Sequence, residues 1–268
     1  MDDYLVIGSG FGGSIVAHKL ALSGAKVSLI ERGPWRDTMP TRSMGIPSRK
    51  PFPQGGKLYT HALRTLHLPY LPKKGLTLNK DGLFEFLYNK GVWMLCSSGV
   101  GGGSHVYGGL HMRPLRDDYW DGHCDEVTAA DMEHHYQNVM GRFGSRVPDE
   151  SDQIPNSLLD VFGDTPELCK STLANPASGL LMPKIPGSPS MVTQEDGIER
   201  REVDWSGMHI LGSEDGAKST LDFVYLEEAI RKGLKVLDLH EALEIRRVKV
   251  GGEDSYEVDL KDHHTKKL

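Results

Sequence analysis

Tyr4-Leu-Val-Ile-Gly-Ser-Gly-Phe-Gly-Gly13 is the stretch that determines the fold class predicted for this chain. Tyr4 to Ile7 is almost wholly apolar and runs into a glycine, which is typical of a strand buried on both faces of a parallel sheet. From Gly12 the apolar residues recur at helical spacing, and Gly24 is placed to end that helix. Val27 to Ile30 is apolar again. The sequence therefore predicts a strand, a glycine turn, a helix and a second, parallel strand.

The same stretch satisfies the Gly-x-Gly-x-x-Gly pattern of dinucleotide-binding turns, with Gly8, Gly10 and Gly13 as its glycines. Gly8 permits the tight turn, Gly10 lets main chain approach a pyrophosphate, and Gly13 lets the helix pack against the strand. Glu31 closes the second strand roughly 20 residues further on, where its carboxylate would bind a ribose and repel a 2′-phosphate. The pattern predicts a site for the ADP half of FAD or NAD, and it disfavours NADP.

Composition excludes several functional classes. The chain has 268 residues and a formal net charge of −6, which argues against nucleic-acid binding driven by positive charge. No apolar stretch is long enough to span a membrane, and the strand that begins at Tyr4 leaves no room for a signal peptide. Three scattered cysteines, Cys96, Cys124 and Cys169, form neither a disulfide framework nor a metal motif. We expect a cytoplasmic protein with no transmembrane segment and no metal site.

The middle of the chain is less regular. Residues 34–56 are crowded with proline, glycine and arginine, so we expect a long surface loop without a regular element. Thr128, with Asp131 three residues later, predicts a helix whose apolar face ends at Phe143. Residues 144–215 contain many prolines and predict mostly irregular structure, with an apolar run at Met208 to Leu211 that is consistent with a strand.

The last third again shows clear periodicity. Ser219 with Asp222 predicts a capping box, and Gly233 is placed to end the helix that follows. A strand is expected over 235–239. Alternating apolar residues on both sides of a turn at 251–254 then predict an antiparallel hairpin. We divide the chain into a first part at 1–113, an inserted lobe at 114–215 and a continuation of the first part at 216–268.

A second glycine-rich run, Gly99 to Gly109, holds six glycines in eleven positions. Together with residues 8–33 and 216–226, this run resembles the N-terminal half of the glucose-methanol-choline (GMC) flavoprotein oxidoreductases, and within them the cholesterol oxidases. The resemblance extends over nearly the whole chain. It implies an α/β fold: a Rossmann-like FAD-binding domain with a parallel sheet, helices and an antiparallel β-meander, carrying an inserted partial substrate lobe.

The resemblance also implies a cofactor, FAD, and a reaction, the oxidation of a secondary alcohol such as a sterol 3β-hydroxyl with oxygen as acceptor. Tyr107 stands where cholesterol oxidases often carry Asn, and His105 replaces a usual Leu. The fingerprint and the resemblance together give these cofactor-binding residues: Gly8, Gly10, Phe11, Gly12, Gly13, Glu31, Gly103, Tyr107, Gly108, Leu110 and Ala242.

The family's catalytic residues lie in a C-terminal half that would begin after Leu268, so no residue of this chain is assigned as catalytic base. The strand that completes the flavin-binding sheet would also lie there. We therefore expect these 268 residues to be an N-terminal fragment that, by itself, binds FAD weakly and oxidises no alcohol.

Two other functional classes remain open. An NAD-linked dehydrogenase or reductase uses the same fingerprint but does not need the second glycine run. A non-catalytic remnant would keep the fold without the chemistry. Residues 212–219 imitate a nucleotide-binding P-loop, but Ala217 replaces the required glycine, and Glu214 and Asp215 would repel phosphate. We therefore reject nucleotide hydrolysis.

Overall fold

The computed structural model describes residues 2–72, 75–114, 116–122, 126–149, 152, 177–185, 188–206 and 208–265. The chain divides into two compact units, one formed by Met1–Val106 with Thr220–Leu268 and the other by Tyr107–Ser219. The domain boundaries expected from the sequence fall close to these junctions and stay a prediction. The expected inserted lobe includes residues 153–176, which lie outside the described residues.

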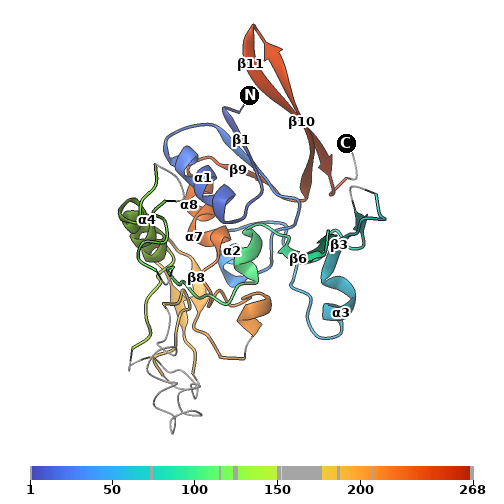
Figure 1. Ribbon diagram of the computed structural model, residues 1–268. Helices are drawn as coiled ribbons and strands as arrows, with labels where there is room; N and C mark the ends of the chain where they lie inside the picture. Colours follow the sequence, from blue (N-terminus) through green and yellow to red (C-terminus); the bar gives the residue numbers. More distant parts are fainter. Residues whose placement is uncertain are drawn as a thin grey trace. The chain divides into compact units, whose positions relative to one another are not determined.

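The first unit is built on the predicted βαβ crossover (Figure 1). Strands β1 (Tyr4–Ile7), β2 (Val27–Ile30) and β9 (Lys235–Leu237) form a parallel sheet in the order β1-β2-β9. Helix α1 (Phe11–Leu22) connects the first two strands and packs against α8 (Leu226–Arg231) and β2. The predicted α/β class, with a parallel sheet and a helical crossover, is confirmed.

A compact apolar core joins α1, α8 and β2. Its buried members come from the helices, from the strand and from the second glycine run, so the two glycine-rich stretches are anchored on one core. They are Ala17, Ala21, Val27, Leu29, Trp35, Val100, Leu226, Ala229 and Leu234.

Strand β1 is less buried than its sequence predicts. Tyr4, Leu5 and Ile7 are 51%, 39% and 47% exposed, whereas every residue of β2 is buried. The expectation that β1 is buried on both faces is therefore wrong. Within the described residues β1 pairs only with β2, so it is an edge strand, and an apolar run alone cannot distinguish an edge strand from a central one.

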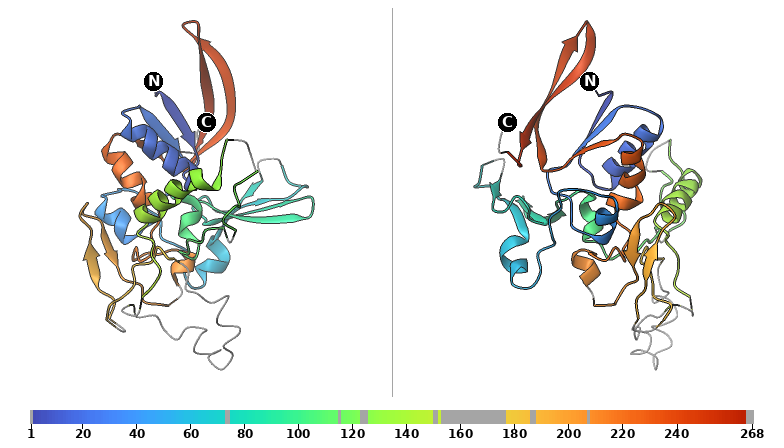
Figure 2. Two further views of the ribbon diagram at one scale, coloured as in Figure 1. Left: turned by 60° about the vertical axis from the view of Figure 1, so that its left-hand side comes forward. Right: turned by 180° about the vertical axis from the view of Figure 1, so that it is seen from behind.

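A second sheet in the same unit follows the order β4-β3-β5-β6 and includes both parallel and antiparallel pairs. The expected hairpin is present and projects away from the parallel sheet (Figure 2). These elements are β3 (Leu63–His67), β4 (Leu76–Thr77), β5 (Phe84–Asn89), β6 (Val92–Ser97), β10 (His240–Val250) and β11 (Glu253–Asp262).

The loop expected at 34–56 contains a regular element, which corrects the prediction. Helix α2 (Met39–Ser43) begins at Thr38, whose side chain forms a reciprocal capping box with Thr41, and Pro40 lies in its first turn. An isolated bridge joins Arg36 to Lys50. The sequence signal for α2 is the Thr-x-x-Thr pattern with a proline in the first turn. The amino-acid composition of the segment does not reveal it. Helix α3 (Lys57–His61) follows.

Two helix predictions near Ser219 also need correction. The helix breaks into α7 (Leu221–Val224) and α8, and Thr220, not Ser219, is the N-cap of α7, without a side-chain cap bond. The Ser219 hydroxyl is instead engaged as a donor to the Phe143 carbonyl at 2.8 Å. Gly233 ends α8 with a φ of +101°, as predicted.

The second unit contains α4 (Ala129–Arg142), whose predicted capping box between Thr128 and Asp131 is formed. Its short strands β7 (Met191–Thr193) and β8 (Glu199–Arg201) pair antiparallel. The apolar run that we considered a strand is a 3₁₀ helix, η2 (Met208–Leu211). Among the described residues no helix has the length and apolar character needed to cross a bilayer.

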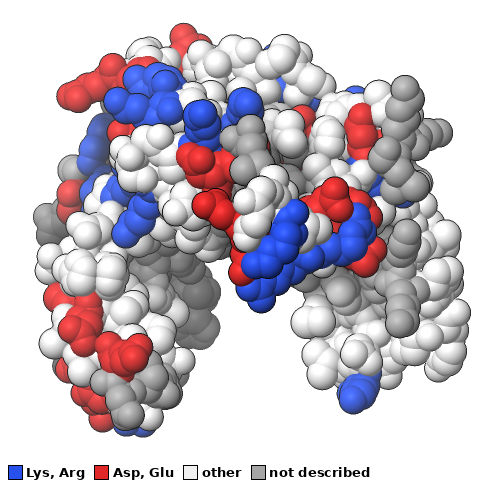
Figure 3. All heavy atoms as spheres, turned by 90° about the horizontal axis from the view of Figure 1, so that it is seen from above, with Lys and Arg blue, Asp and Glu red and all other residues white. Residues whose placement is uncertain are grey.

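Charges of both signs are interspersed on the surface. In Figure 3 several Lys and Arg side chains lie next to Asp and Glu side chains. On the hairpin, for example, Arg246 pairs with Asp259 at 2.6 Å and Lys249 with Asp254 at 2.6 Å.

Candidate functional site

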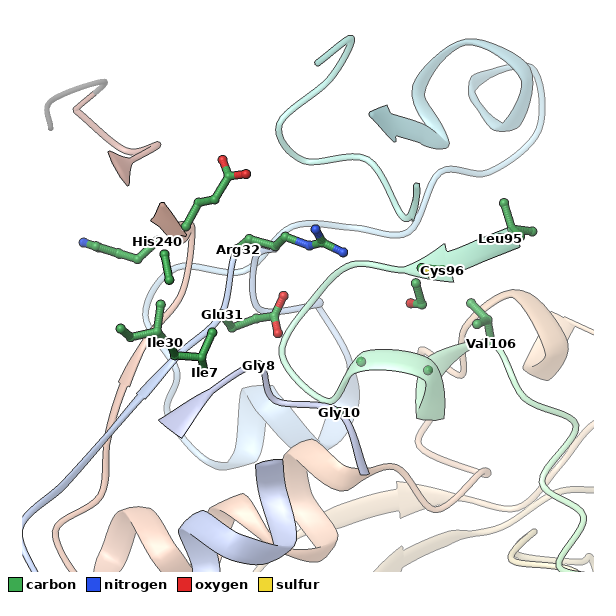
Figure 4. A pocket seen from close by; sticks show the side chains of 15 residues that line it. Ile7, Gly8, Gly10, Ile30, Glu31, Arg32, Leu95, Cys96, Val106 and His240 are labelled. Carbon is green, nitrogen blue, oxygen red and sulfur yellow. The ribbon is translucent and has the colours of Figure 1, made fainter. Parts of the chain in front are cut away.

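The first unit contains a cavity of about 560 Å³, within the range of small-molecule and cofactor sites. We call it the glycine cavity, because both glycine-rich runs contribute to its wall (Figure 4). Its lining residues are Ile7, Gly8, Gly10, Ile30, Glu31, Arg32, Leu95, Cys96, Ser97, Gly102, Gly103, Val106, His240, Glu241 and Ala242.

The fingerprint glycines bring strand, turn and helix into close contact. A Cβ on Gly13 would lie 1.8 Å from the Gly8 carbonyl oxygen, so α1 can approach the end of β1 only if residue 13 has no side chain. A Cβ on Gly10 would instead meet no atom within 4 Å. Gly10 thus leaves open space at the N-terminus of α1, where N–H groups without intrahelical partners point outward.

Glu31 is buried at the end of β2, with only 6% of its surface exposed, and lies beside Gly8 in the cavity (Figure 4). One carboxylate oxygen accepts hydrogen bonds from the Ser9 N–H at 3.0 Å and the Ser9 hydroxyl at 2.8 Å. The other accepts one from the Gly33 N–H at 2.8 Å. A carboxylate has about four acceptor positions, so Glu31 keeps capacity for one further donor from the cavity, such as a ribose hydroxyl.

Ser9 connects the two glycine-rich runs. Its fully buried hydroxyl accepts a hydrogen bond from the Gly101 N–H at 3.1 Å, besides donating to Glu31. The runs also touch directly, because a Cβ on Gly102 would lie 2.7 Å from the Gly10 Cα. Sequence reasoning treated Ser9 as a variable position of the fingerprint and missed this role.

Arg36 binds the backbone just before the second glycine-rich run begins at Gly99. Its fully buried guanidinium donates to the carbonyl oxygens of Asp81, Gly82 and Ser98 at 2.9, 2.8 and 2.7 Å. Burial lowers the pKa of Arg36 to about 10, although the nearby Asp81 carboxylate opposes this shift. The side chain stays charged at neutral pH and fixes the backbone that leads into Gly99.

The other wall of the glycine cavity comes from the base of the hairpin. His240, Glu241 and Ala242 line it, and the β10–β11 register shifts between Ala242 and Glu244. Such a bulge interrupts the hydrogen-bond ladder, which is compatible with the predicted main-chain contact between Ala242 and an adenine base.

The predicted cofactor-binding residues fall into three groups. Gly8, Gly10, Glu31, Gly103 and Ala242 line the glycine cavity. Phe11, Gly12 and Gly13 form the first turn of α1, directly after the fingerprint turn. The remaining three belong to the second unit, and they are Tyr107, Gly108 and Leu110.

In the second unit Tyr107 is part of a polar cluster. Its hydroxyl donates to the Ser219 carbonyl at 2.8 Å and lies 3.1 Å from His111 Nε2. Burial raises the pKa of Tyr107 above its ordinary value and lowers that of His111, so both side chains favour their neutral forms. Lys218, the lysine of the rejected P-loop pattern, is fully buried and donates to the Tyr107 carbonyl at 2.8 Å.

Gly108 and Leu110 flank a sharp turn in this unit. Leu110 forms an isolated antiparallel bridge with Ser178 and remains 53% exposed. Gly109, between them, has a φ of +76° and packs its backbone against Leu180. Their predicted contacts with a flavin stay a prediction.

Several known proteins are similar to this chain in sequence or in fold. No protein-family model matches the chain. A cholesterol oxidase of Acinetobacter baumannii is 26% identical over 96% of the chain but over only 44% of its own length. A cholesterol oxidase of Mycobacterium tuberculosis (strain H37Rv) is 26% identical over 88% of the chain and 38% of its own length. A gluconate 2-dehydrogenase flavoprotein of Pantoea cypripedii is 30% identical over 41% of the chain and 17% of its own length.

The fold is shared with a solved structure of a fungal aryl-alcohol oxidase, at a TM-score of 0.50 and 13% identity, over 99% of this chain and 43% of that one. The chain therefore spans less than half the length of the curated relatives and of the solved structure that it matches. The chain therefore has its fold, including the parallel βαβ core, in common with an aryl-alcohol oxidase, and over nearly its whole length its sequence is similar to that of a cholesterol oxidase.

Proposed function

We propose that this chain is the dinucleotide-binding part of an FAD-dependent oxidoreductase that acts on the CH–OH group of an alcohol. A sterol is the proposed substrate class, because two of the similar proteins are cholesterol oxidases. The observation that carries the proposal is the glycine cavity, where the fingerprint turn, the carboxylate of Glu31 and the second glycine-rich run meet. A cytoplasmic location and a role in steroid metabolism are part of the same proposal.

The residues of the cavity fit the ADP half of FAD. Gly10 leaves space for a diphosphate at the N-terminus of α1, and Glu31 retains acceptor capacity for a ribose hydroxyl. Bound FAD would supply hydride acceptance at its N5 atom, with oxygen as the proposed final acceptor. Within this chain the residues bind and orient the cofactor. No side chain is assigned as the base that removes the alcohol proton.

We propose that a further part of the protein supplies that base. The similar proteins are more than twice as long as the matched region, which leaves room for a catalytic half. The exposed apolar residues Tyr4, Leu5 and Ile7 along the edge strand β1 support this proposal, because a natural sheet edge of this kind is normally covered or paired. The proposed partners of this chain are thus a small-molecule alcohol and a C-terminal half that carries the catalytic base.

The two alternative classes are less well supported. An NAD-linked dehydrogenase would not require the second glycine-rich run to line the cavity, and here Gly102, Gly103 and Val106 do so. A remnant that binds no cofactor would have no reason to retain an open cavity over Gly10.

The absorption spectrum of the purified chain, before and after FAD is added, tests the proposal. We expect perturbed flavin bands that reveal weak binding, and no alcohol oxidation.

Gly10→Ala should weaken FAD binding by about tenfold or more, because its methyl group occupies the diphosphate space. It should not change the melting temperature, since that methyl group meets no protein atom within 4 Å.

Two outcomes would contradict this account in different ways. A flavin spectrum that the chain leaves unchanged at high FAD concentration would refute the proposed cofactor. A yellow, fully flavin-loaded chain that oxidises alcohols would instead show that no catalytic half is missing.

A further inference from the structure

We propose that Arg32 is the positively charged partner of the cofactor diphosphate in the glycine cavity. The inference rests on the proposed dinucleotide site and goes beyond the fingerprint, which contains no charged side chain near the diphosphate. Arg32 directly follows Glu31 at the end of β2 and lines the cavity. Among the lining residues, all of them within the described ranges, it is the single Lys or Arg.

The cavity needs such a charge. Its other ionised side chains are the carboxylates of Glu31 and Glu241, which repel a diphosphate that carries about two negative charges. The N-terminus of α1 offers only about half an elementary charge. A guanidinium that reaches the same space is therefore the strongest available source of attraction for phosphate oxygens.

Arg32 shares its ion-pair partner with a second guanidinium group. Arg32 Nη2 lies 2.8 Å from Glu85 Oε2, but the same carboxylate is also bound by Arg64, whose Nη1 lies 2.7 Å from Glu85 Oε1. One buried carboxylate thus serves two guanidinium groups. Glu241, another acid of the cavity wall, lies 2.8 Å from His263 Nε2.

Of the two guanidinium groups that share Glu85, that of Arg32 is the more accessible, and it lines the cavity. The side chain of Arg64 is 2% exposed, whereas that of Arg32 is 39% exposed. Figure 4 shows Arg32 reaching across above Glu31 toward the strand of Leu95 and Cys96, with Gly8 and Gly10 on the opposite wall. Glu85 contacts the guanidinium at Nη2, so the remaining N–H groups of the fork can be offered to a phosphate oxygen.

A purely structural role for Arg32 predicts a different result on mutation. Glu85 would remain paired with Arg64 after Arg32→Met, so its carboxylate would not be left as an isolated buried charge. The variant should therefore fold, and its ligand binding can be measured.

The test compares ADP with adenosine as ligands, using titration calorimetry on the purified chain and on the variants Arg32→Met and Arg32→Lys. Arg247→Met is the matched control, because it removes the same charge from an exposed pair with Asp254 on the hairpin. At low salt, Arg32→Met should weaken ADP binding by about tenfold or more. Adenosine binding should not change, and high salt should reduce the difference for ADP. Arg32→Lys should retain part of the affinity, and Arg247→Met all of it.

The outcomes separate this inference from the proposed function. If the unmodified chain binds ADP and Arg32→Met binds it equally well, Arg32 is not the diphosphate partner, although the dinucleotide site stands. An equal loss for adenosine and ADP would also overturn the inference, because it would place Arg32 at the nucleoside or in the fold. If the unmodified chain binds neither ligand, the proposed site fails, and the role of Arg32 fails with it.

Discussion

Replacing Gly13 with alanine is expected to lower the free energy of unfolding of this chain by about 3 kcal/mol. The methyl group would lie 1.8 Å from the Gly8 carbonyl oxygen and 3.0 Å from its carbonyl carbon. Both atoms belong to backbone that is fixed between β1 and α1, so the clash cannot be relieved by rotating a side chain. Helix and strand must separate, which disturbs the core around Ala17 and Leu29.

Gly12→Ala is the matched control for this prediction. A Cβ on Gly12 would meet no atom within 4 Å, and the residue lies in the first turn of α1. Alanine is the better helix former, so this variant should be neutral or more stable by up to about 1 kcal/mol. Urea unfolding followed by circular dichroism measures both. Equal stabilities of the two variants would mean that α1 does not approach β1 as closely as described.

The second large effect is expected for Glu31→Gln. The carboxylate accepts three hydrogen bonds from the backbone and side-chain donors of Ser9 and Gly33. A glutamine amide replaces one acceptor oxygen with a donor, so at least one N–H of the protein would face another N–H. This mismatch should cost about 1–3 kcal/mol of stability, the penalty for a buried group without a partner.

The same variant should also weaken ADP and FAD binding, because the orientation that best satisfies Ser9 and Gly33 leaves less acceptor capacity for the ribose. Glu244→Gln, at a side chain that is 63% exposed on the hairpin, removes the same charge and should change neither quantity. Thermal unfolding and calorimetric titration measure the two effects. If Glu31→Gln left both unchanged, Glu31 would have no role in either the turn or the site.

The parts of the fold that could be predicted from the sequence are those with local causes. The fingerprint turn, α1 and its end at Gly24 follow from glycine spacing and apolar periodicity within about 30 residues. The capping box of α4 and the end of α8 at Gly233 are equally local, and the structure has both.

Long-range partners explain what could not be predicted. The exposure of Tyr4 and Ile7 depends on which strand lies beside β1, and the sequence of β1 does not contain that information. Arg36 and Arg64 are charged residues that composition suggests are exposed, yet they are buried because distant carbonyl and carboxylate groups receive them. Arg32 was missed for the same reason, since its partner Glu85 lies in another sheet.

The candidate site shows the same division. Gly8, Gly10 and Glu31 were predicted as neighbours from their spacing, and they line one cavity. The contact between the two glycine-rich runs through Ser9 could not be foreseen, because it joins residues about 90 positions apart and depends on how both loops pack.

A crystal structure of the chain with bound ADP tests the central claim most directly. The account predicts that the diphosphate lies at the N-terminus of α1 beside Gly10 and that a ribose hydroxyl donates to Glu31. ADP bound at any other place, or a glycine cavity that stays free of ADP in crystals where the ligand binds elsewhere, would contradict it.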